Sequence, residues 1–362
     1  MNKRRVMQLL PTLAYGDAVG NDALAIHEML LSRGFEAALY AEHVQPRLLS
    51  DRVRPFSEWP GTTEADVILY HGSTGTELND WLPEQPGTKG MIYHNITPPG
   101  FFDAYSPQLA LLTASGYAGM LRLRDCVDFC IADSAYNAAE LVRMGYTCPI
   151  DVCPILIPFA DYEQEPDPGV LARYGQDGWT NLLFVGRIAP NKKQEDVIRA
   201  FCCYHRRYNP KSRLFLVGSS AGLETYEERL RAYADKLGVG EQVLFSGHIS
   251  FREILAYYHL ADLFLCMSEH EGFCVPLVEA MFFEKPILAH AAAAVPETLG
   301  GGGLLMADKD PEVAAAALHR LMTDAALRQA LRQAQREQLK GYRYEPVQRK
   351  LWGILERVLG DG

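Results

Sequence analysis

Two glutamates in one short stretch of the sequence are placed to bind hydroxyl groups. The stretch is SEHEGFCVPLVEAM, residues 268–281, in which Glu271 lies in a glycine-containing loop and Glu279 lies after Pro276. An apolar run before it predicts a buried strand, and proline suits the first turn of a following helix. Amide groups at such a turn favour a phosphate, and an ionised carboxylate beside it can accept hydrogen bonds from two hydroxyls. Acids are also favoured in first helical turns by the helix dipole alone.

A second motif supplies positive charge. NLLFVGRIAPNKKQEDVI, residues 181–198, predicts a strand that ends at Gly186-Arg187, with Lys192 and Lys193 at the start of the next helix. Glycine allows close approach of a ligand to the backbone, and an arginine with a lysine at a strand's carboxyl end forms a compact clamp for a diphosphate. Lysines at a helix start also commonly face solvent, which fits Lys193 better than Lys192.

A histidine in the first half is a third candidate. YHNITPPGFF, residues 93–102, places His94 at the end of a predicted strand, before a loop that two prolines stiffen. An imidazole there could bind a sugar or orient a hydroxyl, or it could be a structural histidine that anchors the loop. His71, at the end of the strand DVILY, has a similar but weaker case.

The elements that must position these residues repeat one pattern: an apolar strand, a glycine-rich or polar turn, and an amphipathic helix. The first unit of the pattern runs from Val6–Leu10 through residues 16–20 to a helix from about Asp22 to Arg33. Further strands are expected at 37–40, 67–70, 91–94, 129–132, 181–185, 214–217, 243–246, 263–267 and 287–289, and helices are expected to begin near Lys193, Leu223, Phe251 and Pro276. This alternation implies βαβ units with parallel sheets.

The pattern falls into two domains. Residues 161–178, rich in proline, glycine and acids, predict a linker between a first domain at 1–160 and a second at 179–341. The helical tail is expected to break at 341–346, so that a terminal helix at about 342–362 is a candidate to pack on the first domain. Because ligands bind at the carboxyl ends of parallel strands, two facing sheets would place the site in the cleft between them.

Composition excludes several classes of protein. The chain has 362 residues, 48% of them hydrophobic, and a formal net charge of −10. That charge argues against a nucleic-acid binder, which needs a basic face. The eight cysteines include no CxxC pair and no zinc-type spacing, which predicts reduced cysteines in a cytoplasmic protein. The apolar run Val6–Leu10 is too short for a signal peptide or a bilayer span.

One segment has a pattern that could touch a membrane. HVQPRLLSDRVRPFSEW, residues 43–59, interleaves three arginines with apolar side chains. Such a segment could contact the anionic inner face of a membrane. An ordinary surface segment is the favoured interpretation, because the first half of the chain is acidic.

The motifs FVGRIAPNKK, FSGHIS and SEHEGFCVPLVEAM, in this order, resemble the carboxyl-terminal half of the retaining nucleotide-sugar glycosyltransferases of family 4. Looser matches are ADSAYNAAEL at 132–141, the turn at 16–21 and VPETLGGGG at 295–303, so that the resemblance covers most of the chain. The resemblance implies the GT-B fold, an α/β architecture of two Rossmann-like domains with parallel sheets that face a central cleft.

The resemblance also implies roles for individual residues. Glu279 would hold the nucleotide ribose, Glu271 the donor sugar, and Arg187 and Lys192 the diphosphate. The implied donor site comprises Gly20, Gly186, Arg187, Lys192, His248, Ile249, Glu271, Gly272, Phe273, Cys274, Val275 and Glu279, with Arg187, Lys192, Glu271 and His94 as the catalytic set. Two positions depart from the family's pattern, which usually has glycine where Lys193 and Cys274 stand.

The expected function is transfer of a hexose, mannose first and otherwise glucose, galactose or GlcNAc, from a GDP- or UDP-sugar to a hydroxyl of a glycan or lipid-linked saccharide. Bacterial surface polysaccharide assembly is the kind of process that such a reaction serves. Two alternatives stay open: a GT-B nucleotide-sugar epimerase and a non-catalytic nucleotide-sugar-binding protein. A nicotinamide dehydrogenase is disfavoured, because residues 16–20 lack the spacing of GxGxxG.

We expect no metal and no other cofactor. Asp308-Lys309-Asp310 has the DxD pattern by which glycosyltransferases of the GT-A fold hold a divalent cation. Here the pattern precedes Pro311, so Asp310 has the position of a helix N-cap. Arg187 and Lys192 are expected to meet the charge of the diphosphate instead.

Overall fold

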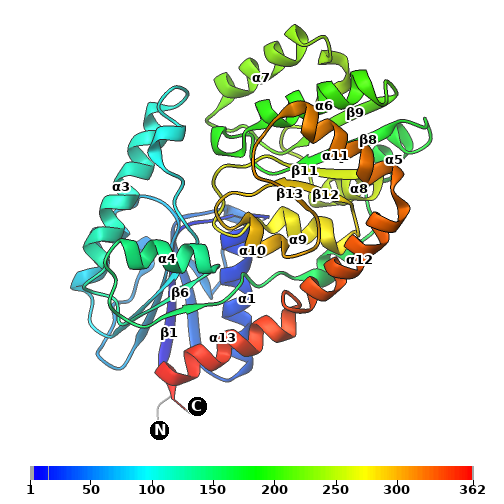
Figure 1. Ribbon diagram of the computed structural model, residues 1–362. Coiled ribbons are helices and arrows are strands. Elements are labelled where there is room, and N and C mark those ends of the chain that lie inside the picture. Colours follow the sequence, from blue (N-terminus) through cyan, green and yellow to red (C-terminus); the bar gives the residue numbers. More distant parts are fainter. Residues whose placement is uncertain (1–3, 15, 361–362) are drawn as a thin grey trace. The chain divides into compact units, whose positions relative to one another are not determined.

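The computed structural model describes residues 4–14 and 16–360 and divides into two compact units (Figure 1). The first unit comprises residues 1–100, 108–159 and 342–362, and the second comprises residues 101–107 and 160–341. Residues 161–178, which composition predicts to be a linker, thus fall within the second unit. The last two residues of the predicted terminal helix lie outside the described residues.

The first unit is built on a seven-stranded parallel sheet with the order β3-β2-β1-β4-β5-β6-β7. The chain adds β2 and β3 on one side of β1 and then returns to its other side with β4. The strands are β1 Arg5–Leu13, β2 Glu36–Val44, β3 Val53–Pro55, β4 Val67–Gly72, β5 Thr88–Tyr93, β6 Phe129–Ala132 and β7 Ile150–Val152.

Helices of the first unit bury apolar faces against this sheet. They are α1 Ala18–Ser32, α2 Leu78–Trp81, α3 Pro107–Leu123, α4 Ala135–Arg143 and α13 Tyr344–Leu359. Val347, Leu351 and Leu355 of α13 lie in the same buried cluster as Val6 of β1 and Ile26 of α1. The last helix of the chain is therefore part of the core formed by the first residues.

The second unit has a six-stranded parallel sheet with the order β10-β9-β8-β11-β12-β13. Its strands are β8 Thr180–Val185, β9 Ser212–Val217, β10 Val243–Phe245, β11 Leu263–Cys266, β12 Ile287–His290 and β13 Leu304–Met306. Its helices are α5 Pro168–Tyr174, α6 Gln194–Arg207, α7 Glu224–Lys236, α8 Phe251–Leu260, α9 Val275–Phe282, α10 Val295–Leu299, α11 Pro311–Thr323 and α12 Ala325–Lys340.

The predicted α/β class with parallel sheets is confirmed. The strands that the sequence pattern missed or ended too early have local explanations. The sequence pattern missed β3, β7 and β13, which are three-residue strands at sheet edges and too short to show a period. It also ended β1 before Pro11, whereas the strand continues to Leu13. Pairing with β4 stops at Leu9, so Pro11 lies where β1 has one neighbour and its missing amide is tolerated.

The aromatic rings of segment 43–59 pack against other aromatic side chains of the first unit. Trp59 packs edge-on against Tyr40 and Trp81, with ring centroids 4.9 and 5.1 Å away. The segment exposes Leu49, Arg47 and Arg52, and it also exposes the acidic residues Asp51 and Glu58. Over residues 4–14 and 16–360, no helix combines the length and hydropathy that crossing a membrane requires.

Candidate active site

The candidate donor residues of the second unit lie where the order of its strands reverses. From β8 the chain first adds β9 and β10 on one side, and β11 then pairs with the other side of β8. Both strands are parallel, so the loops that follow them leave the sheet at the same edge. In open α/β sheets this switch point is where ligands bind. The Gly-Arg…Lys motif and the paired-glutamate motif therefore meet there, although about 80 residues separate them.

Asn191 fastens the two loops together. Its backbone carbonyl accepts a hydrogen bond from the amide of Glu269 at 2.9 Å, and its side-chain amide donates to the carbonyl of His270 at 3.1 Å. The residue is buried, so both bonds are shielded from water. This double contact fixes Lys192 and Glu271, the next residue in each loop, side by side.

Lys192 and Glu271 form an ion pair at the switch point. The Lys192 Nζ atom lies 2.6 Å from Glu271 Oε2, and the side chains are 22% and 7% exposed. Burial by itself lowers the pKa of a lysine, but the Glu271 carboxylate, with Cys274 and Cys266 nearby, raises it by more, so the pKa of Lys192 lies above its ordinary value. A fixed, charged ammonium is thereby held beside a carboxylate.

Arg187 is positioned by its backbone, while its guanidinium remains exposed. Its carbonyl accepts a hydrogen bond from Gln194 Nε2 at 3.0 Å, and its Nη2 donates to the carbonyl of Ala221 at 3.0 Å. Gly186, which precedes Arg187, packs against Gly218, which follows β9 and has a φ of +149°. A Cβ built on Gly218 would lie 2.0 Å from the carbonyl oxygen of Gly186, so only glycine fits beside the clamp.

The loop from Gly272 to Val275 leads directly into α9. Thr298 Oγ1 donates to the carbonyl of Phe273 at 2.5 Å and holds the loop against α10. Cys274 is the N-cap residue of α9, and its side chain makes no capping bond to the helix amides. Pro276 has no amide hydrogen and the amide of Leu277 donates to the carbonyl of Cys274 at 3.0 Å, so Val275 is the residue of the first three in α9 whose amide could meet solvent or an anion.

The two positions at which the sequence departs from the family's glycines share one backbone conformation. Lys193 has φ +52° and Cys274 has φ +75°, both in the left-handed region. Glycine adopts this region without steric cost, whereas other residues are disfavoured there. The loop geometry that glycine would favour is thus kept by a lysine and a cysteine.

Glu279 is buried on α9 between two tyrosines. Its Oε1 accepts a hydrogen bond from Tyr162 at 2.7 Å, and its Oε2 accepts one from Tyr258 at 2.6 Å. The sequence reasoning missed both tyrosines. Tyr162 belongs to the segment taken for a linker and Tyr258 to α8, so no short-range pattern connects them to Glu279.

The environment of Glu279 predicts a pH effect on stability. Burial raises its pKa, while the tyrosine hydroxyls oppose the rise only in part. The folded carboxyl therefore holds a proton that the unfolded chain releases at about pH 4.3. From there to the folded pKa, the contribution of Glu279 to the free energy of unfolding is expected to fall as pH rises. Urea unfolding across this pH range should show that the free energy of unfolding falls less steeply with pH in the Glu279→Gln variant than in the native protein. Equal slopes in the two proteins would contradict a raised pKa for Glu279.

His248 and Ile249 follow β10, the edge strand of the sheet. Strand β9 separates β10 from β8, so these residues lie farther along the same edge than Arg187. The His248 side chain is exposed and Ile249 is half-buried. Their role beside a nucleotide base remains a prediction.

The structure places Gly20 and His94 in the first unit. Gly20 is in the first turn of α1, which begins four residues earlier than the pattern predicted, and a Cβ there would lie 2.7 Å from the carbonyl oxygen of Ala14. His94 has a side chain that is 2% exposed, and its Nδ1 lies 2.9 Å from Asp133 Oδ2. Its Nε2 lies 2.8 Å from Nδ1 of His71.

The predicted capping role of Asp310 is confirmed. Its carboxylate accepts hydrogen bonds from the amides of Glu312 at 2.8 Å and Val313 at 3.1 Å, and Pro311 is the first residue of α11. Asp308 accepts a bond from the amide of Asp310. In the described part of the chain, neither aspartate belongs to a group able to hold a metal ion.

Replacing Asp310 with alanine should therefore destabilise the second unit by about 0.5–2 kcal/mol, the usual cost of a lost N-cap. Asp308→Ala is the matched control and should cost less, because it removes one exposed bond. Urea unfolding of both variants measures the difference. Equal losses would mean that the cap is not the main contribution of Asp310.

Part of this chain is similar to known glycosyltransferases. Residues 176–338 match the family model described as glycosyl transferases group 1. A D-inositol 3-phosphate glycosyltransferase of Corynebacterium jeikeium (strain K411) is 33% identical over 222 residues, 57% of this chain and 52% of the relative. A GDP-mannose-dependent alpha-(1-6)-phosphatidylinositol monomannoside mannosyltransferase of Mycolicibacterium smegmatis is 31% identical over 172 residues, 44% of each chain. The chain spans about half the length of the curated relatives it matches, or less.

Solved structures are similar over nearly the whole chain. Sucrose-phosphate synthase from Thermosynechococcus elongatus superimposes with a TM-score of 0.78 at 17% identity, covering 99% of this chain and 100% of that one. Anabaena Alr3699/HepE in complex with UDP and glucose gives a TM-score of 0.77 at 17% identity, covering 98% and 100%. At this identity the likeness shows the fold, which is GT-B.

Proposed function

We propose, from the match of residues 176–338 to glycosyl transferases group 1, that this chain transfers a hexose from a nucleotide sugar to a hydroxyl group. The observation that carries the proposal is the Lys192–Glu271 pair at the switch point of the second sheet. The pair places an ammonium that can bind a diphosphate next to a carboxylate that can bind a sugar, near the amide of Val275 at the start of α9.

The proposed reaction breaks the bond between the anomeric carbon and the diphosphate and forms a bond from that carbon to an acceptor oxygen. Negative charge grows on the departing diphosphate, and Lys192, Arg187 and the amide of Val275 stabilise it more than they stabilise the bound donor. The diphosphate accepts the proton of the acceptor hydroxyl. Retention of the anomeric configuration is proposed from the resemblance to family 4.

Two carboxylates are proposed to hold the nucleotide and the donor sugar. Glu279 would accept hydrogen bonds from the ribose hydroxyls and Glu271 from the donor sugar. Mannose is the favoured sugar, because two similar proteins are a GDP-mannose-dependent mannosyltransferase and a mannosylfructose-phosphate synthase. UDP-glucose is the main alternative, since one similar fold was solved in complex with it.

The proposed acceptor is a glycan or a lipid-linked saccharide. A lipid-linked acceptor would be met at the cytoplasmic face of a membrane, and this is the proposed location. Leu49 and the arginines of segment 43–59 are the groups that such contact would use.

A donor panel tests the proposal. Purified protein is incubated with GDP-mannose, UDP-glucose, UDP-galactose and UDP-GlcNAc, first without acceptor, and release of nucleotide and free sugar is measured. Slow hydrolysis of one donor, accelerated by saccharide acceptors, supports a transferase. An epimerised nucleotide sugar would instead identify an epimerase. If calorimetry shows nucleotide binding but no acceptor of several classes gives turnover, the protein is a non-catalytic nucleotide-sugar-binding protein.

A further inference from the structure

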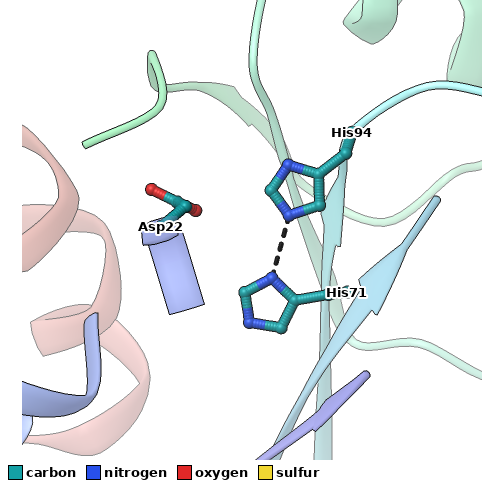
Figure 2. Close-up of side chains that lie close together, drawn as sticks. All are labelled: Asp22, His71 and His94. Carbon is teal, nitrogen blue, oxygen red and sulfur yellow. Dashed lines mark hydrogen bonds between the residues drawn. The ribbon is translucent and has the colours of Figure 1, made fainter. Parts of the chain in front are cut away.

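The first unit contains a buried group of metal-ligand side chains at the switch point of its own sheet, between β1 and β4. Asp22 comes from α1, His71 from the end of β4, and His94 directly follows β5 (Figure 2). One ligand atom from each lies within 4.8 Å of the others. Asp22 and His71 are 3% and 0% exposed, and the His94 side chain is 2% exposed.

The outer partners of the two histidines determine where their protons lie. Gln8 Nε2 donates to the carbonyl of Ala23 at 3.0 Å, which turns its Oε1 toward His71 Nε2, 3.0 Å away. Since this oxygen only accepts, His71 Nε2 carries a hydrogen. His94 Nδ1 lies 2.9 Å from Asp133 Oδ2, so it carries a hydrogen for the same reason.

The inner nitrogens are then left facing each other without a proton. In neutral rings, His71 Nδ1 and His94 Nε2 both present lone pairs, yet they lie 2.8 Å apart. Two lone pairs at this distance repel. A cation must therefore lie at the pair, as either a metal ion or an additional proton.

The third side chain favours a metal ion over a proton, because a proton shared by two ring nitrogens needs no carboxylate beside it. Asp22 is buried and offers a carboxylate oxygen within 4.8 Å of a ring nitrogen of each histidine. Within residues 4–14 and 16–360, Asp22 forms no ion pair with lysine or arginine, and Asp133 pairs with His94. Asp22 Oδ1 accepts a hydrogen bond from the amide of Leu156 at 2.8 Å, and Figure 2 shows one of the two Asp22 oxygens on the side of the histidines.

We propose that Asp22, His71 and His94 bind a divalent transition-metal ion, Zn²⁺ by ligand preference. Two imidazoles and a carboxylate are a frequent zinc set, in which a fourth position is taken by water or substrate. Asp133 and Gln8 are the outer acceptors that orient metal-bound histidines. The proposal goes beyond the transferase function and does not rest on it. It departs from the expectation of no metal, and it assigns His94 Nε2 to the ion instead of a sugar.

A second cluster in the chain serves as the comparison. Cys266, Glu271 and Cys274 also offer ligand atoms within 4.8 Å of one another. There, however, the Lys192 ammonium already lies 2.6 Å from Glu271 and provides the positive charge. An ion at this second site would have to displace a lysine, whereas an ion bound by both histidines and Asp22 would remove a repulsion between lone pairs.

The test measures bound metal and its ligands in the intact chain. The protein is incubated with excess Zn²⁺, desalted and analysed by mass spectrometry for zinc, and a parallel sample is loaded with Co²⁺ for absorption spectroscopy. We expect one tightly held ion per chain, and visible cobalt bands without the near-ultraviolet charge-transfer band of a thiolate ligand. Failure of the native protein to retain either ion, with a proton shared by the two rings in nitrogen NMR, overturns the proposal. A thiolate band also overturns it.

Variants locate the ion. Asp22→Asn and His71→Gln should each lower zinc retention at least tenfold. His27→Gln, which changes a buried histidine of α1 outside the cluster, should retain the ion, as should Cys266→Ser. Zinc retention unchanged in a folded Asp22→Asn or His71→Gln variant contradicts the assignment. If these variants do not fold, the cobalt spectrum of the native protein decides between nitrogen–oxygen and thiolate ligands.

Discussion

Replacing Lys192 with alanine is expected to lower kcat by about 100- to 1,000-fold while raising the donor KM much less. The reason is that the ammonium, fixed 2.6 Å from Glu271, meets charge that grows on the leaving diphosphate during the reaction. Steady-state kinetics with the donor found in the panel gives both constants. Partial rescue by added ethylammonium would show that the missing charge causes the loss.

Lys193→Ala is the matched control for this variant. It removes the same charge from the adjacent residue, which pairs with Glu269 at 3.3 Å and is outside the proposed clamp. Lys192→Ala also leaves the buried Glu271 without its cation, at a cost of about 1–3 kcal/mol, so activity is compared below the unfolding midpoint of each variant. A raised donor KM with unchanged kcat would make Lys192 a ground-state anchor instead.

Glu279→Gln is expected to weaken UDP or GDP binding by about 10- to 100-fold, because hydrogen bonds to a charged acceptor contribute about 1.5–3 kcal/mol. The loss should be confined to ligands with ribose hydroxyls. Calorimetry with UDP and with 2′,3′-dideoxy-UDP compares a ligand that has the ribose hydroxyls with one that lacks them. The native protein should prefer UDP strongly, and the variant should bind the two nearly equally.

The two tyrosines supply the control for Glu279. Tyr258→Phe and Tyr162→Phe each remove one bond to the carboxylate and leave its charge in place. Both should keep most of the preference for UDP over the dideoxy nucleotide. A preference that survives in Glu279→Gln, but disappears in a tyrosine variant, would assign the ribose to the tyrosine and leave Glu279 as its support.

Several features of this protein follow from its sequence alone. Alternation of apolar runs with amphipathic helices gave the α/β class, because local periodicity reports whether one or both faces of an element are buried. The loops that carry Arg187, Lys192 and Glu271 were placed at strand ends for the same reason. Capping by Asp310 was also predictable, since an N-cap bonds only to amides two or three residues away.

The contacts between distant segments were decided by the tertiary structure. Lys192 meets Glu271 because β11 pairs with β8 and not with β10, and sheet order is a result of packing between elements far apart in the chain. The same holds for Glu279 with Tyr162 and Tyr258. In the first unit, His71 and His94 were each recognised at a strand end, yet no pattern in the sequence indicated that their rings lie 2.8 Å apart, with Asp22 beside them. Short-range patterns report burial and backbone conformation, whereas the identity of a buried side chain's partner depends on which strands become neighbours.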